Sequence, residues 1–258
     1  MRRLIISNTH YQTIVAIQLK LSLFKFDDVV LLISDHSRES AYVVKRLNKL
    51  GLFEEVHYLC SRKILYNYSF WQKIRDFYDL SFRNTGRYTF YLDEVKNKRF
   101  DEIVFYNFGP DIHGLYCLLS EYNKNICISL FEEGLLSYGA SEKTSWRLHL
   151  TSLIRKIRGK KNIYDAKGCF YSFFPSLYEG GFYPVKIPFI GSSGHSVNCI
   201  KSAFGMEECN LTYDKKYIFF SSAYDFEGGS PIGEFELAKK EYLIESVLSA
   251  RYQYIPPP

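Results

Sequence analysis

The sequence contains no long hydrophobic run, and this excludes a membrane-spanning chain. No stretch of the 258 residues reaches the roughly 18 uncharged residues that a membrane helix requires. The apolar residues near the N-terminus end at Ser7, which is too early for a secretory signal peptide. Glycine (16) and proline (8) are scarce, so collagen-like and linker-rich proteins are excluded as well. We therefore expect a cytoplasmic protein.

The six cysteines and the small net charge exclude further classes. No two cysteines form a Cys-x-x-Cys pair, so zinc-binding and thioredoxin-like functions have no support, and scattered cysteines are typical of reduced thiols. We also find no metal-ligand spacing and expect neither a metal nor another cofactor. A net charge of +5 is too small to indicate nucleic-acid binding, and we expect no nucleic-acid partner.

The composition is that of a folded, aromatic-rich globular protein. Hydrophobic residues make up 47% and charged residues 24%, which excludes general disorder. Tyrosine (22) and phenylalanine (21) dominate an aromatic content of 17%. The length allows one large domain or two small ones.

Apolar strands alternate with amphipathic helices over the first half of the chain. The expected strands cover residues 4–7, 29–34, 55–59, 103–106 and 126–131. The expected helices cover residues 9–23, 40–50 and 112–119, with a further helical stretch over 64–98. Gly51 ends the second helix. This alternation predicts an α/β fold with a Rossmann-like parallel sheet and flanking helices.

The pattern changes after Gly134. A helix is expected over 145–158, followed by a mixed region rich in Phe, Tyr and Gly over 169–190. A strand over 216–221, a helix over 234–248 and a strand starting at 251 then open a second Rossmann-like unit. We expect a first lobe over 1–212 and an incomplete second lobe over 213–258.

The strongest candidate for chemistry is Glu132-Glu133-Gly134, which follows a buried strand. In open parallel sheets, ligands bind at the carboxyl ends of the strands. Two adjacent carboxylates tend to raise one pKa, which suits a general base, and Gly134 allows a sharp turn. The alternative is an ordinary polar turn after a strand with a helix-capping role, since short motifs often match by chance.

Two other polar segments are expected at the same sheet edge. Thr9, His10 and Gln12 follow the first strand, where a helix N-terminus can bind an anion or a sugar hydroxyl. Asn107 and His113 follow the fourth strand and can line the same cleft. The alternatives are a helix cap for the first segment and a helix-starting turn for the second.

Two segments further along the chain are candidates for binding. Residues 146–161 are expected to form an amphipathic helix with one apolar face and several basic residues beside it. Such a helix can lie on an anionic membrane surface. The alternative is a core-packing helix with a solvated basic face, which we favour slightly. Ser221 and Ser222 lie between a strand and a helix and can contact phosphate, although no nucleotide-binding fingerprint is present.

Taken together, these motifs resemble bacterial lipooligosaccharide sialyltransferases (glycosyltransferase family 52) and bacterial polysialyltransferases. The resemblance is carried by Glu132-Glu133-Gly134 and by Thr9 and Gln12. It extends to the stretch from Pro175 to Pro188, and to the strand over 216–221 with the residues that follow it up to Pro256.

The resemblance implies a two-lobed GT-B-like fold that transfers sialic acid from CMP-sialic acid to a surface glycan, such as capsule or lipooligosaccharide. Glu132 would be the general base, with Glu133 as second choice. Thr9, His10, Gln12, Asn107 and His113 would bind the acceptor, and Ser221 and Ser222 the donor. This family needs no metal.

One departure from the family pattern concerns the donor site. Where the family has His-Pro, this chain reads Ile255-Pro256, so the donor-binding lobe is expected to be incomplete. Two alternatives follow: an inactive acceptor-binding lobe and a non-catalytic Rossmann-like binding module. A lipid-linked acceptor would place the protein at the inner face of the membrane, in contact through residues 146–161.

Overall fold

The structure is a computed structural model, and it describes most of the first 206 residues. The described ranges are 1–37, 39–60, 70–83, 95, 98–108, 110–134, 137–139, 146–160, 163–191 and 193–206. The elements expected over 213–258, and with them the second lobe and the candidate donor residues Ser221 and Ser222, lie outside these ranges.

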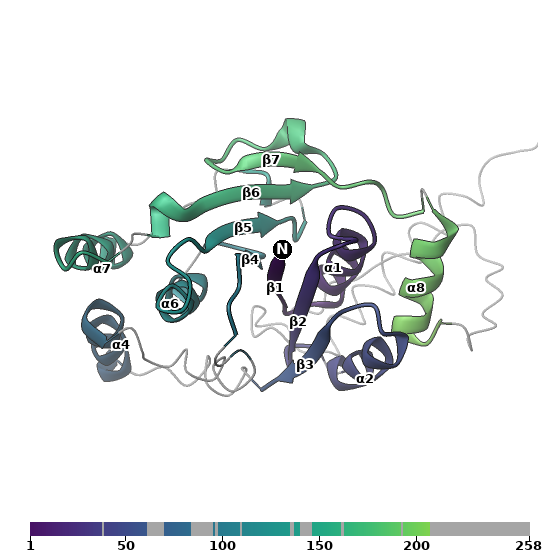
Figure 1. The fold of residues 1–258 in the computed structure, drawn as a ribbon, viewed down its shortest axis with the longest axis horizontal. Helices are drawn as coiled ribbons and strands as arrows, with labels where there is room; N and C mark the ends of the chain where they lie inside the picture. Colours follow the sequence, from purple (N-terminus) through teal and green to yellow (C-terminus); the bar gives the residue numbers. More distant parts are fainter. Residues whose placement is uncertain are drawn as a thin grey trace, which may run out of the picture. The chain divides into compact units, whose positions relative to one another are not determined.

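A seven-stranded, entirely parallel sheet forms the centre of the described part (Figure 1). The strands are β1 (Arg2–Ser7), β2 (Asp28–Ser34), β3 (Glu55–Leu59), β4 (Glu102–Phe105), β5 (Cys127–Phe131), β6 (Lys167–Ser172) and β7 (Tyr183–Lys186). Their order in the sheet is β3-β2-β1-β4-β5-β6-β7. This confirms the predicted α/β fold with a Rossmann-like parallel sheet.

Helices follow most of the strands. They are α1 (His10–Leu21), α2 (Ser40–Leu50), α4 (Phe70–Tyr78), α6 (Pro110–Leu119), α7 (Trp146–Ile157) and α8 (Gly194–Phe204). A π-helical turn, η1 (Asp79–Arg83), continues α4, and η4 (Ile163–Ala166) and η5 (Pro175–Leu177) are short 3₁₀ turns. Gly51 ends α2 in the left-handed conformation, as predicted.

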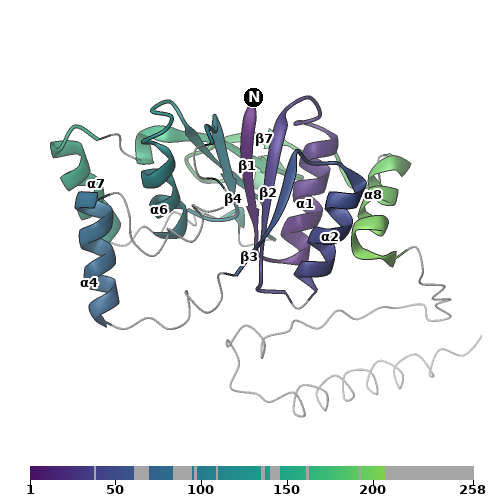
Figure 2. The same cartoon turned by 60° about the horizontal axis from the view of Figure 1, so that its bottom comes forward.

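The sheet separates two hydrophobic cores, because successive side chains of a strand point to opposite faces. Leu4 of β1 belongs to the first core, where α6 contributes Ile112 and its neighbours. Ile5 belongs to the second core, which also holds Val15 of α1 and Val43 of α2, together with residues of α8. Figure 2 shows α1, α2 and α8 grouped together, with α6 on the other side of β1 and β4.

Two strands, β6 and β7, lie in the region expected to be mixed and were not predicted from the sequence. Three of the six β6 residues are only partly buried, and β7 is a mostly exposed edge strand that contains Pro184. Proline is tolerated at an edge, where one side of the strand needs no hydrogen-bonding partner. Neither strand therefore shows the continuous apolar run that identified the first five.

The strand order reverses direction between β1 and β4. The chain moves outward from β1 through β2 to β3, and then crosses to β4 on the other side of β1. At such a reversal the connecting segments leave the two central strands in opposite directions, which opens a crevice at their carboxyl ends. The segments that follow β1, β4 and β5 meet at this edge of the sheet.

Candidate functional site

The acidic turn that follows β5 separates its two carboxylates. Glu132 is 4% exposed, whereas Glu133 is exposed. Gly134 has a φ of 138°, a backbone conformation that side-chain-bearing residues rarely adopt, so the sharp turn here depends on glycine. Hydrogen bonds join the two carboxylates to different partners, Glu132 to Tyr11, Tyr138 and Phe173 and Glu133 to Gln12.

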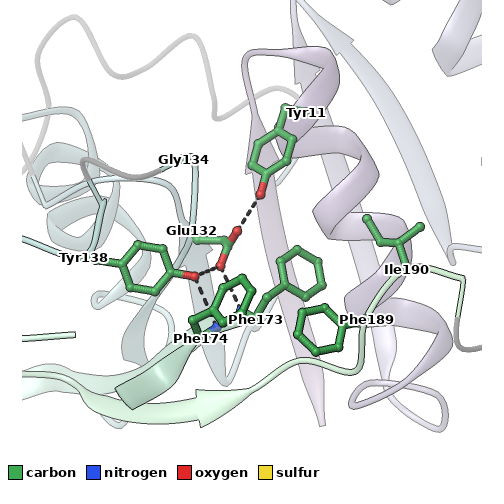
Figure 3. Close-up of a pocket in the computed structure, with 8 residues that line it drawn as sticks. All are labelled: Tyr11, Glu132, Gly134, Tyr138, Phe173, Phe174, Phe189 and Ile190. Atoms are coloured by element: carbon green, nitrogen blue, oxygen red, sulfur yellow. Dashed lines mark hydrogen bonds between the residues drawn. The ribbon is translucent and has the colours of Figure 1, made fainter. Parts of the chain in front are cut away.

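Three donors converge on the buried carboxylate of Glu132 (Figure 3). Its Oε1 accepts from the hydroxyl of Tyr11 at 2.5 Å. Its Oε2 accepts from the hydroxyl of Tyr138 and from the backbone N–H of Phe173 at 2.8 Å. These bonds tie the turn after β5 to helix α1 and to the segment that follows β6.

Both tyrosines remain protonated donors at neutral pH. Burial, and then the hydrogen bond to Glu132, raises the pKa of Tyr138 to about 12. The same causes raise the pKa of Tyr11. A phenol that keeps its proton donates to the carboxylate, and hydrogen bonds to a charged acceptor are stronger than neutral ones.

A cavity of about 560 Å³ opens beside this carboxylate. Figure 3 shows Glu132 near its centre, between Tyr11 on α1 and the aromatic side chains of the segments after β6 and β7. The lining residues are Tyr11, Glu132, Gly134, Tyr138, Phe173, Phe174, Phe189 and Ile190. Aromatic walls around one charged group are typical of small-molecule sites, in which a few polar groups fix the orientation of the ligand.

Thr9 and Gln12 form the N-terminal cap of α1. The N–H of Gln12 donates to Oγ1 of Thr9 at 3.3 Å, and Oε1 of Gln12 accepts from the N–H of Thr9 at 3.3 Å. This reciprocal pair is a capping box. Nε2 of Gln12 also donates to Oε2 of Glu133 at 2.9 Å, which links the cap to the acidic turn. The capping interpretation therefore accounts for Thr9, and Gln12 caps the helix and binds Glu133, but neither residue lines the cavity.

The other predicted acceptor-binding residues are absent from the cavity lining. His10 packs edge-on against Phe204 of α8, with ring centroids 5.4 Å apart, and burial lowers its pKa. Asn107 follows β4 and is half-buried. His113 is buried within α6, and burial, with a smaller effect of the nearby Arg155 charge, lowers its pKa to about 4. His113 is 2% exposed and does not line this cavity.

The aromatic residues of the cavity were not predicted from the sequence. Tyr11 lies between the two cap residues that were selected. Phe173, Phe174 and Phe189 lie in the region described only as rich in Phe, Tyr and Gly. That aromatic enrichment was the available signal, but the two strands that bring these residues to the sheet edge had not been predicted.

Within the described ranges, no group of three or more His, Cys, Asp or Glu side chains has the arrangement of a metal site. None of the helices in those ranges combines the length and apolar character needed to cross a bilayer.

Comparisons with known proteins leave the family open. No family model matches the sequence, and no curated protein matches it. Among solved structures, the chain is similar to the crystal structure of CalG4, the calicheamicin glycosyltransferase, with a TM-score of 0.38 and 11% identity. The match covers 74% of this chain and 54% of that structure. A likeness of this size assigns no function, and the fold assignment rests on the strand order described above.

Proposed function

We propose that this chain is a glycosyltransferase of the sialyltransferase type, in which Glu132 accepts the proton of an acceptor sugar hydroxyl. The observation that carries the proposal is a single buried carboxylate at the carboxyl edge of a parallel sheet, facing an aromatic-lined cavity. The sequence resemblance supplies the donor, CMP-sialic acid, and the acceptor class, a surface glycan.

The hydrogen bonds of Glu132 leave Oε1 as the base atom. A carboxylate has about four lone-pair positions, two on each oxygen. Oε2 already accepts from Tyr138 and from the N–H of Phe173, so both of its positions are filled. Oε1 accepts only from Tyr11 in the described structure, so it retains one position for an acceptor hydroxyl.

The aromatic walls suit a carbohydrate acceptor. A sugar ring has an apolar face of C–H groups, which can pack on an aromatic ring, while its hydroxyls point outward. Phe173 and Phe189 lie nearly parallel, with centroids 5.9 Å apart, and Phe174 meets Phe189 at 60°. A ring that packs on these side chains would present a hydroxyl toward Glu132, and this positioning is itself a source of rate acceleration.

The proposed reaction is a single displacement. The acceptor oxygen attacks the anomeric carbon of sialic acid and forms the new glycosidic bond. The bond from that carbon to the phosphate oxygen of CMP breaks, and its electron pair leaves with CMP. The hydroxyl proton passes to Oε1 of Glu132. Tyr138 and the N–H of Phe173 act as positioning groups, because they hold Oε2 and so fix the orientation of Oε1.

One observation favours a second candidate, a non-catalytic acceptor-binding lobe. The three hydrogen bonds to Glu132 also connect the segments after β5 and β6 with α1. This role is structural and does not require catalysis. Both candidates predict glycan binding in the cavity, and only the first predicts consumption of CMP-sialic acid.

Release of CMP from CMP-sialic acid, measured with a panel of surface glycans, distinguishes the two candidates. A general base contributes about 10²–10⁴-fold to a rate, so Glu132→Gln should lower kcat by that factor. Glu133→Gln is the matched control, because the same change falls on an exposed carboxylate one residue away. We expect it to lower kcat less than about tenfold.

Two results would contradict the proposal. If Glu132→Gln turns over at the wild-type rate, Glu132 is not the base. If the wild-type chain releases no CMP with any acceptor and yet binds the glycans, the non-catalytic candidate is correct.

A further inference from the structure

Helix α7 exposes its apolar side chains and buries polar ones. The exposed side chains are Leu150, Leu153 and Ile157, and Ile157 is 78% exposed. The buried side chains are Thr151, Ser152 and Arg155. The expected core-packing helix is therefore wrong for Leu150, Leu153 and Ile157, which are exposed. The expected solvated basic face holds for Lys156 and Arg158, whereas Arg155 is 1% exposed.

Helix α4 and the turn η1 show the same inverted pattern, in which apolar side chains are exposed and polar ones are buried. Their exposed side chains are Phe70, Trp71, Ile74, Tyr78 and Phe82, a spacing that places them along one side of a helix. Asp79 and Ser81 are buried. Large exposed side chains are common when they occur singly, but a continuous apolar patch marks an interaction site.

The two inverted helices lie side by side, as both Figure 1 and Figure 2 show. Nη1 of Arg158, the residue after α7, donates to the carbonyl oxygens of Ser81 and Phe82, each at 2.9 Å. The guanidinium of Arg158 also lies 5.5 Å from the centre of the Phe82 ring. We call the exposed apolar residues of α4, η1 and α7 listed above the α4–α7 face.

The positive charge of the chain is concentrated in these same segments. Residues 70–83 and 146–160 contain eight basic and two acidic residues, a net charge of +6, whereas the whole chain has a net charge of +5. Arg75, Lys156 and Arg158 are exposed beside the apolar side chains. The remainder of the chain is therefore close to neutral.

We propose that the α4–α7 face binds the surface of an anionic lipid bilayer. Apolar residues of an amphipathic helix enter the boundary between headgroups and acyl chains, and Trp and Tyr prefer this interface. Basic residues at the rim attract anionic headgroups. A second copy of this chain is the less suitable occupant, because a twofold interface would bring the two basic rims together. The proposal holds whatever sugar the enzyme transfers.

Vesicle sedimentation with the unmodified full chain is the first test. Vesicles of equal parts phosphatidylcholine and phosphatidylglycerol should pellet the protein, and vesicles of phosphatidylcholine alone should pellet much less. Added salt should weaken binding, because it screens exposed charges. The chain has two tryptophans, Trp71 and Trp146, and both lie in α4 or α7. Tryptophan fluorescence should therefore shift to shorter wavelength when the anionic vesicles are added.

Charge variants test the basic rim. Arg75→Gln with Lys156→Gln should weaken binding to anionic vesicles about 30-fold, since each basic residue near the lipid contributes about fivefold. The matched control is Lys49→Gln with Lys201→Gln. These two exposed lysines lie on α2 and α8, which are far from α4 and α7 in Figure 1, and we expect no change.

Apolar variants test insertion. Trp71→Ser with Ile157→Ser should weaken binding more than tenfold, because the apolar surface that enters the lipid is lost. Tyr42→Ser on α2 is the control for removing an exposed hydrophobic side chain, and it should bind like the wild type. Circular dichroism checks that each variant is folded.

Three outcomes would overturn the proposal. Equal pelleting with neutral and anionic vesicles would contradict the charge argument. Wild-type binding by either double variant would place the contact elsewhere. A wild-type dimer in sedimentation equilibrium that Ile157→Ser converts to a monomer, without vesicle binding, would assign the α4–α7 face to a second copy of the chain.

Discussion

The hydroxyl of Tyr138 is predicted to hold the buried carboxylate of Glu132 in place, and Tyr138→Phe removes it. This hydroxyl donates to Oε2 of Glu132 and accepts from the N–H of Phe174 at 3.2 Å. A hydrogen bond to a charged group contributes about 1.5–3 kcal/mol, and the backbone N–H adds about 1 kcal/mol. We therefore expect the free energy of unfolding to fall by about 3 kcal/mol, measured by urea denaturation. For a protein of this size, Tm should fall by roughly 6–12 °C.

The control for this change is Tyr122→Phe, because the side chain of Tyr122 is 48% exposed. It should alter the free energy of unfolding by less than about 0.5 kcal/mol. If Tyr138→Phe lowers the free energy of unfolding by no more than Tyr122→Phe does, the reasoning is refuted.

An alkaline titration gives a second check. The pKa of Tyr138 is raised to about 12 in the folded protein, so its contribution to stability is complete below pH 10 and is lost as the pH rises toward 12. Over that interval the wild type should lose more stability than Tyr138→Phe.

Three further predictions follow from the surroundings of the site. Gly134→Ala should lower the free energy of unfolding by about 1–3 kcal/mol in urea denaturation, because φ is 138° and no atom within 4 Å obstructs an added Cβ; an unchanged midpoint would contradict this. Thr9→Ala should cost about 1 kcal/mol in thermal denaturation through loss of the cap and leave KM for the acceptor unchanged; a raised KM would instead support acceptor binding by Thr9. The folded pKa of His113 is lowered to about 4, so its contribution to stability is present above pH 6.5 and is lost as the pH falls toward 4. His113→Phe should reduce the acid-induced loss of unfolding free energy by about 3 kcal/mol. If the unfolding free energies of the variant and the wild type depend on pH in the same way, this prediction is wrong.

The sequence predicted the first five strands because each is a short apolar run bounded by polar residues. Buried parallel strands are apolar on both faces, so Val29–Ile33 and similar runs stand out without any alternation. The last two strands carry a different signal, since β7 is an exposed edge with Pro184 and β6 begins with partly buried residues. Their assignment depends on pairing with β5, which is a tertiary contact that local sequence does not encode.

The candidate site was predictable in position and unpredictable in its contacts. Topology alone puts the residues after β5 at the carboxyl edge of the sheet, so Glu132 could be selected from the sequence. Which of the two carboxylates is buried depends on Tyr138, six residues further along the chain, and on Phe173 and Tyr11, which come from distant segments. The inversion of α7 was also hidden, because an amphipathic pattern does not say which face points inward.

A structure of the chain with a bound acceptor glycan and CMP tests the central proposal most directly. The proposal predicts that the sugar ring packs on Phe173 or Phe189 and that one of its hydroxyls lies about 2.6–3.2 Å from Oε1 of Glu132. An acceptor bound away from this cavity, or one held in it with no hydroxyl in reach of Glu132, would contradict the proposal.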